Sequence, residues 1–205
     1  MINEIISIIL QILVFTLIPF LVFLIKKKTL RGFLDYIGLK STNKKAVQLA
    51  LLSSTLLFVP IIIILLINPD FKEIMHHPES MTGKFREMGF GLKSAIFILL
   101  VSILKTALSE EIFFRGFVAK RLIAVTNYKI GNMIQSILFG VLHVLLFLGI
   151  SSNPFFLFII FLFPAIGAYV MTYINEKKSN GSIIPSWIMH AFANIMSYSI
   201  ISYLL

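Results

Sequence analysis

Long uninterrupted blocks of apolar residues constrain this chain more than any other feature of its sequence. Of 205 residues, 58% are hydrophobic and 13% are charged, and the mean hydropathy is +0.96, whereas soluble domains have about 25% charged residues. Blocks of about 20 residues are long enough to cross a bilayer as helices. The sequence therefore predicts an all-α, polytopic transmembrane helical bundle and excludes soluble, disordered and fibrous proteins. We expect six spans, near residues 5–25, 46–67, 93–125, 130–150, 155–174 and 182–205.

The loops between these blocks are short, and no internal repeat or low-complexity linker divides the chain. We expect one integrated domain, in which residues 1–92 supply two transmembrane helices and residues 93–205 supply a catalytic core of four. The chain has no cysteine, which excludes disulfides, thiol nucleophiles and Cys-based metal sites. The net charge of +9 does not indicate nucleic-acid binding, because the charges fall between the spans, as membrane proteins usually place them.

Lysine and arginine are unevenly distributed over the loops, and this asymmetry predicts the orientation in the membrane. If the N-terminus lies outside, thirteen of the 18 Lys and Arg residues belong to the cytoplasmic side and four to the outside. We therefore expect both termini outside. The cytoplasmic set is Lys26, Lys27, Lys28, Arg31, Lys40, Lys44, Lys45, Arg115, Lys120, Arg121, Lys129, Lys177 and Lys178.

The third span contains charged residues, each of which costs roughly 2.5–3.5 kcal/mol at the centre of a bilayer. Glu111 and Arg115 are four residues apart with the acid first, so they share a helix face and can pair. Glu110 points about 100° away, which leaves its carboxylate available. Two acids at a solvated helix end would be the simpler interpretation, but the apolar pattern continues beyond them. Lys105 is expected to be structural, either snorkelling or paired with an acid of another span.

Polar residues recur in helical register in the fourth and sixth spans as well. Phe139 and His143 are four residues apart, and so are His190 and Asn194. Each pair alone is explained by packing, with a histidine bonded to a carbonyl or an asparagine joining two helices. Three helices that all direct polar groups inward instead predict one shared, hydrated cavity at membrane depth. The fourth span extends its stripe through Asn132, Gln135 and Ser136.

The residue types of this cavity suit the activation of water and the stabilisation of an oxyanion, which together hydrolyse an amide. Glu110 would accept a proton from water, and His143 would orient that water or share the proton. His190 and Asn194 carry N–H donors on one face. They would hold the oxyanion of a tetrahedral intermediate, a role worth roughly 10²–10³ in rate per donor.

The three motifs resemble those of a known family of membrane proteins. In order along the chain they are Glu110-Glu111-x-x-Phe114-Arg115-Gly116, Ser136-x-x-Phe139-Gly140-x-x-His143 and His190-x-x-x-Asn194. This order and these flanking residues are similar to the CPBP family, which comprises CAAX-protease-like and bacteriocin-processing (Abi) proteins, also called type II CAAX prenyl endopeptidases. The resemblance covers roughly residues 94–203.

The resemblance implies a polytopic helical bundle and an intramembrane glutamate-type endopeptidase without a cofactor. It implies catalytic roles for Glu110, His143, His190 and Asn194 and supporting roles for Glu111, Arg115 and Phe139. Six spans are fewer than eukaryotic-type CAAX enzymes have, and the Ile-, Lys- and Phe-rich composition indicates an AT-rich bacterial genome. We therefore expect a protein of the bacterial cell membrane, whose partners are the lipid bilayer and a peptide or membrane-protein substrate rather than a prenylated CAAX protein.

Three other functions fit parts of the pattern. Glu110, His143 and His190 supply a His₂Glu set of the kind that binds catalytic zinc, although the H-E-x-x-H pairing is absent. A non-catalytic bacteriocin-immunity membrane protein would bind a partner and would not need the buried charges. A proton-coupled carrier uses intramembrane Glu and His but is expected to contain repeats or broken helices. The zinc-dependent intramembrane metalloprotease is the principal alternative.

Overall fold

The protein folds into a bundle of helices. The computed structural model describes residues 2–205, which contain helices and loops but no strand. The prediction of an all-α fold is confirmed. Three of the segments, labelled η, are π-helical. In chain order the elements are α1 (Ile2–Lys27), α2 (Phe33–Ile37), α3 (Lys44–Ile67), α4 (Pro69–Met75), α5 (Met81–Met88), α6 (Leu92–Leu100), η1 (Val101–Leu108), η2 (Glu111–Ala119), α7 (Lys120–Val125), α8 (Tyr128–Phe147), α9 (Pro154–Tyr173), η3 (Ile174–Lys178) and α10 (Ile184–Tyr203).

Five helical stretches are long and apolar enough to cross a membrane. They expose apolar side chains outward, as lipid-facing surfaces do; on α1, for example, Leu10 and Leu13 are 55% and 58% exposed. These stretches make the chain an integral membrane protein. They are Glu4–Lys27, Lys44–Ile67, Leu92–Val125, Tyr128–Phe147 and Pro154–Lys178.

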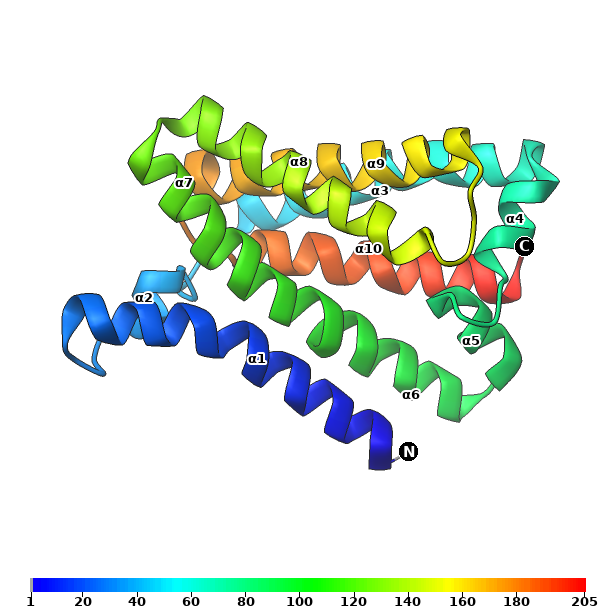
Figure 1. Ribbon diagram of the computed structural model, residues 1–205, viewed down its shortest axis with the longest axis horizontal. Coiled ribbons are helices and arrows are strands. Elements are labelled where there is room, and N and C mark those ends of the chain that lie inside the picture. The colour runs from blue at the N-terminus through cyan, green and yellow to red at the C-terminus, as the bar shows by residue number, and fades with distance from the viewer. Residues whose placement is uncertain (1) are drawn as a thin grey trace.

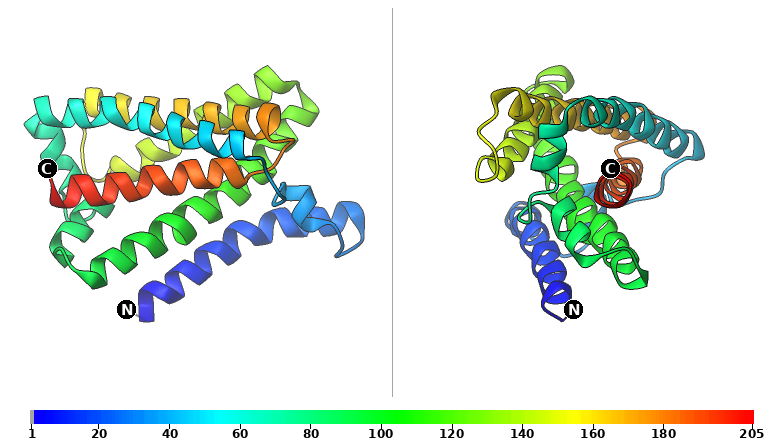
Figure 2. Two further views of the ribbon diagram at one scale, coloured as in Figure 1. Left: turned by 180° about the vertical axis from the view of Figure 1, so that it is seen from behind. Right: turned by 90° about the vertical axis from the view of Figure 1, so that its right-hand side faces the viewer.

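The predicted count of six spans is therefore one too high by length and composition. The sixth, α10, has 20 residues but too many serine, histidine, asparagine and tyrosine side chains to qualify. It packs against α3, η1 and α5, and none of its residues is exposed. Figures 1 and 2 show it between the α3–α8–α9 group and the long helix formed by α6, η1, η2 and α7. An interior helix can carry polar residues because neighbouring helices, rather than lipid, surround it.

Asparagine side chains start three of the long helices. Asn43, Asn127 and Asn153 precede α3, α8 and α9, and each side-chain oxygen accepts a backbone N–H from the first turn. Such caps satisfy amide groups that a helix start otherwise leaves unpaired. The sequence thus fixes where these helices begin.

The first residues of the polar stripe on α8, Asn132 and Gln135, join α8 to α9. Gln135 donates to the Ala168 carbonyl at 3.1 Å, and Asn132 donates to the Tyr169 carbonyl, also at 3.1 Å. Gly140 allows the close approach, because a Cβ there would lie 2.7 Å from the Phe161 carbonyl oxygen. These residues hold two helices together. The end of the stripe, at Phe139 and His143, is therefore the part that can serve a site.

Both termini lie at one end of the bundle, and the basic loops lie at the other (Figures 1 and 2). The basic end holds α2, the α7–α8 turn and the connection from η3 to α10. Arg115 is 1% exposed, so it lies inside the bundle and leaves the set of loop charges. The remaining asymmetry still favours an external position for both termini.

Single-cysteine labelling tests this orientation, since the chain has no cysteine of its own. Thr29→Cys and Lys177→Cys, at exposed positions of the basic end, should resist an impermeant thiol reagent in intact cells and react after permeabilisation. His77→Cys and Ser152→Cys, exposed at the opposite end, should react in intact cells. The reverse labelling pattern would show that the orientation is inverted.

Candidate active site

The charged residues of the long helix lie where two π-helical segments meet. η1 ends at Leu108 and η2 begins at Glu111, with Ser109 and Glu110 between them. π-Helical turns are rare and occur frequently at functional sites. The sequence pattern, interpreted with a period of 3.6 residues, gives no signal for them.

Glu111 and Arg115 form an ion pair inside the bundle. Arg115 Nη1 lies 3.1 Å from Glu111 Oε1, and the two side chains are 1% and 0% exposed. The guanidinium also stacks on the Phe139 ring, 4.1 Å from its centroid, and its Nη2 lies 3.1 Å from Met171 Sδ. The predicted pairing along one helix face is present, and α8 and α9 enclose its cation.

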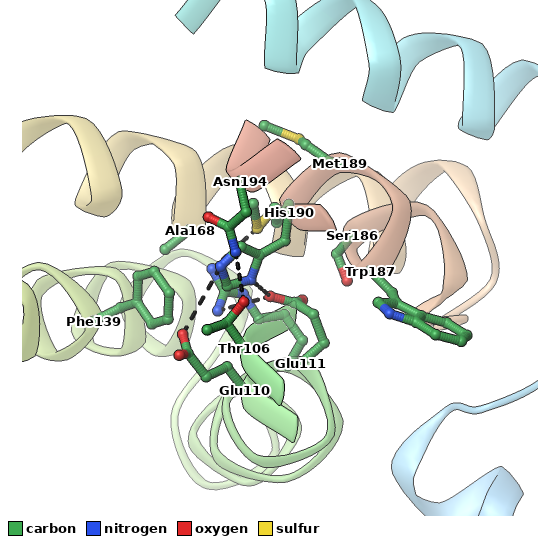
Figure 3. A network of polar contacts seen from close by, with 12 residues as sticks. Thr106, Glu110, Glu111, Phe139, Ala168, Ser186, Trp187, Met189, His190 and Asn194 are labelled. Atoms are coloured by element: carbon green, nitrogen blue, oxygen red, sulfur yellow. Dashed lines mark hydrogen bonds and ion pairs between the residues drawn. The ribbon is translucent and has the colours of Figure 1, made fainter. Parts of the chain in front are cut away.

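His190 of α10 bonds the same carboxylate. Its Nδ1 lies 3.0 Å from Glu111 Oε1, and its Nε2 lies 3.9 Å from Glu110 Oε2 (Figure 3). The Arg115 partner requires Glu111 to be ionised, and an ionised carboxylate only accepts hydrogen bonds. His190 Nδ1 therefore carries a proton. This bond fixes the ring so that Nε2 points toward Glu110.

His143 of α8 is oriented in a similar way by its own helix. Its Nδ1 lies 2.9 Å from the Phe139 carbonyl oxygen, which can only accept, so Nδ1 again carries the proton. The Phe139 ring lies against both imidazoles, at centroid distances of 4.6 Å to His143 and 5.9 Å to His190. In both His143 and His190, Nδ1 thus has a hydrogen-bond partner, whereas Nε2 makes no hydrogen bond within residues 2–205.

Asn194 lies one turn beyond His190 on α10. Its Nδ2 donates to Thr106 Oγ1 at 2.7 Å. Thr106 belongs to none of the three motifs, although its position four residues before Glu110 is a signal in the sequence. Trp187 lies outside the motifs too, and its Nε1 donates to the Ile103 carbonyl at 2.8 Å, which joins α10 to η1.

The four residues predicted to be catalytic line one cavity of about 480 Å³. Glu110, His143, His190 and Asn194 lie along its wall, whereas the Glu111–Arg115 pair is not part of the lining. The rest of the lining is mostly apolar and comes from α3, α4, α5, η1, α8, α9 and α10. The cavity extends toward the end that carries the termini, where Glu79 and Ser80 line it. We call it the site cavity.

The remaining intramembrane charge, Lys105, serves the packing of α1. Its Nζ lies 3.7 Å from Glu4 Oε2, so it pairs with an acid of another span, one of the two roles expected. Gln11 of α1 donates to the Lys105 carbonyl at 2.8 Å. Lys105 is not among the residues that line the site cavity.

The metal-binding alternative depends on bringing three ligands together. Within residues 2–205, no group of three or more His, Asp or Glu side chains is placed to hold a metal ion. Glu110, His143 and His190 share the site cavity without forming such a group. Their geometry does not favour the zinc hypothesis, which chelation tests directly.

A comparison with protein families gives one match. The model described as "Type II CAAX prenyl endopeptidase Rce1-like" matches residues 92–196, just over half of the chain. The matched region runs from the start of α6 into α10 and contains all seven predicted site residues. No curated protein and no solved structure matches the chain.

Removing the buried carboxylate should destabilise the fold. Glu111→Ala leaves the Arg115 cation without its partner inside the bundle, which costs about 3–5 kcal/mol. Glu4→Ala is the matched control, because it removes the acid of a pair that is 52% exposed on the Glu4 side, and such pairs contribute about 0–1 kcal/mol. Thermal unfolding in detergent should show a large loss for the first variant and a small one for the second. Equal losses would contradict the assignment.

Proposed function

The chain belongs to the Rce1-like family of type II CAAX prenyl endopeptidases, and on this basis we propose that it is an intramembrane endopeptidase. Its substrate is a peptide or a membrane-associated protein. The observation that carries the proposal is the buried Glu111–Arg115–His190 network, which directs His190 Nε2 toward Glu110 at the wall of the site cavity. A protein that only binds a partner gains nothing from burying charges in this arrangement.

In the proposed reaction Glu110 is the general base. Its carboxylate takes one proton from water, and the hydroxide attacks the carbonyl carbon of the scissile peptide bond. The 3.9 Å between Glu110 Oε2 and His190 Nε2 is too long for a direct hydrogen bond. A water placed to one side of the line between the two atoms is within reach of both. His143 lines the same cavity with a free Nε2 and helps to orient the water.

The tetrahedral intermediate then needs hydrogen-bond donors for its oxyanion, and we assign these to His190 and Asn194. Because Glu111 already accepts the Nδ1 proton of His190, a donation from Nε2 requires the doubly protonated imidazolium. Before water is deprotonated, Glu110 and Glu111 balance the positive charges of Arg115 and His190, and once Glu110 is protonated the oxyanion supplies the second negative charge. A charge-neutral cluster is the least costly state for four ionisable groups away from water.

Collapse of the intermediate completes the hydrolysis. The C–N bond breaks, and the proton held by Glu110 passes to the leaving nitrogen, so that the products are a carboxylic acid and an amine, between which a proton then passes to give a carboxylate and an ammonium. The mostly apolar lining of the cavity keeps bulk water away from these steps, which strengthens the electrostatic interactions within the site. The same lining suits a substrate segment with apolar side chains.

We place the enzyme in a bacterial cell membrane.

Glu110→Gln tests the proposal while keeping the shape of the side chain. The variant should fold normally and lose about 10²–10⁴ in turnover, measured on purified protein in liposomes with internally quenched apolar peptides. Glu79→Gln is the matched control, because Glu79 lines the same cavity at its far end and should keep full activity. Wild-type activity in Glu110→Gln would remove Glu110 from the mechanism.

The same assay decides between the glutamate and zinc mechanisms. A strong chelator should leave turnover of the wild type unchanged. One zinc ion per chain, lost together with activity on chelation and restored with it on addition of zinc, would instead establish the metalloprotease.

A further inference from the structure

The hydroxyl group of Thr106 lies between the backbone of η1 and the side chain of Asn194. Its Oγ1 is 3.0 Å from the Val101 carbonyl oxygen. It is also 2.7 Å from Asn194 Nδ2, a contact drawn in Figure 3. A second backbone carbonyl, that of Ser102, lies at 3.4 Å. Both Thr106 and Asn194 line the site cavity. The contact therefore joins the proposed oxyanion donor to the helix that carries the proposed base.

A hydroxyl group has a single proton, and here that proton is donated in a hydrogen bond to a carbonyl oxygen. Carbonyl oxygens only accept, so Thr106 donates to the backbone of η1 and offers Asn194 a lone pair. A lone pair attracts the NH₂ edge of an amide and repels its oxygen. The Thr106 hydroxyl thus selects one of the two orientations of the Asn194 amide, which differ by a 180° flip.

The selected orientation is the one that an oxyanion site requires. With one N–H bonded to Thr106, the second N–H of Asn194 remains for another acceptor, and Asn194 makes no other side-chain hydrogen bond within residues 2–205. The flipped amide would instead present its oxygen, which repels a developing negative charge. If both orientations of the amide were populated, a smaller fraction of molecules would be ready to react.

The π-helical register of η1 contributes to this arrangement. In an α-helix a threonine hydroxyl usually bonds the carbonyl three or four residues earlier. Thr106 instead makes its shorter bond to Val101, five residues earlier, within η1. The widened turn therefore helps to set where the hydroxyl lies relative to α10.

We infer that Thr106 is a positioning residue, whose hydroxyl accepts one N–H of Asn194 and fixes the amide for donation to the oxyanion. This inference rests on the proposed function. Thr106 acts through Asn194 and does not itself contact the reacting atoms. Its removal should therefore lower kcat and leave KM largely unchanged, because the oxyanion exists only after substrate has bound.

A double-mutant cycle measures this dependence. Asn194→Ala should lower kcat by about 10²–10³, and Thr106→Val, which keeps the shape but removes the hydroxyl, by about 10–10². In the Asn194→Ala background, Thr106→Val should cause no further loss. Thr106→Ser, which keeps the hydroxyl, should restore most of kcat. Thr55→Val is the matched control, since Thr55 also bonds a backbone carbonyl, that of Leu51 at 3.1 Å, but is exposed on α3.

Three results would overturn the inference: Thr106→Val as active as Thr55→Val, losses that multiply in the double variant, or Thr106→Ser no better than Thr106→Val. The same cycle measured on Tm tests the hydrogen bond without any activity. The two substitutions should be coupled in Tm, and additive effects would also reject the inference. Wild-type activity in Glu110→Gln would show that the proposed function fails. The Tm cycle on Thr106 and Asn194 would still test their hydrogen bond in that case.

Discussion

The ion pair between Glu111 and Arg115 is the interaction on which the rest of the site depends. Two charges inside a membrane bundle are costly to bury, and removal of either partner leaves the other uncompensated. Further contacts hold the pair in place: Glu111 binds His190, and Arg115 stacks on Phe139, although Glu111 Oε2 and Arg115 Nε have no hydrogen-bond partner within residues 2–205. The carboxylate thereby determines the protonation of His190 Nδ1. The position of Nε2 beside Glu110 follows from that bond.

The bundle is arranged so that these polar groups meet without facing lipid. α10, the most polar of the long helices, is enclosed by its neighbours, while the apolar faces of α1 and α8 point outward. Its links to the long helix include side-chain bonds from Trp187, His190 and Asn194, beside apolar contacts of Ile195 and Tyr198 with the cluster around Phe97. Some of the contacts that dock α10 therefore also assemble the site.

Much of this arrangement can be predicted from the sequence, for identifiable physical reasons. Apolar blocks reveal spans because the bilayer requires length and hydropathy, and helical spacing reveals the Glu111–Arg115 pair because both residues lie on one helix. Three polar stripes correctly indicated a shared cavity. The sixth span, predicted near residues 182–205, corresponds to α10, which is too polar to qualify by hydropathy, because a helix surrounded by protein need not be apolar.

Other features could not be predicted, because they depend on how separate helices meet. The π-helical turns around Glu110 leave no trace in a period of 3.6 residues. The bond of His190 to Glu111, rather than to Glu110, requires knowledge of the approach of α10. Arg115 lies in the third span and is counted among the cytoplasmic charges when the orientation is predicted, yet its side chain is buried inside the bundle. A threonine at position 106 is unremarkable in a helix, and its role becomes visible only from its distance to Asn194.

The orientation of His190 is the central claim, and nitrogen NMR of the protein in bilayers tests it most directly. The chain has four histidines, so ¹⁵N-histidine labelling gives few resonances, and comparison with a His190→Gln variant assigns the one of interest. We predict a protonated Nδ1 of His190 that is hydrogen-bonded to a carboxylate, with a resonance that changes in Glu111→Gln. An unprotonated Nδ1, or a resonance indifferent to Glu111, would contradict the proposed site.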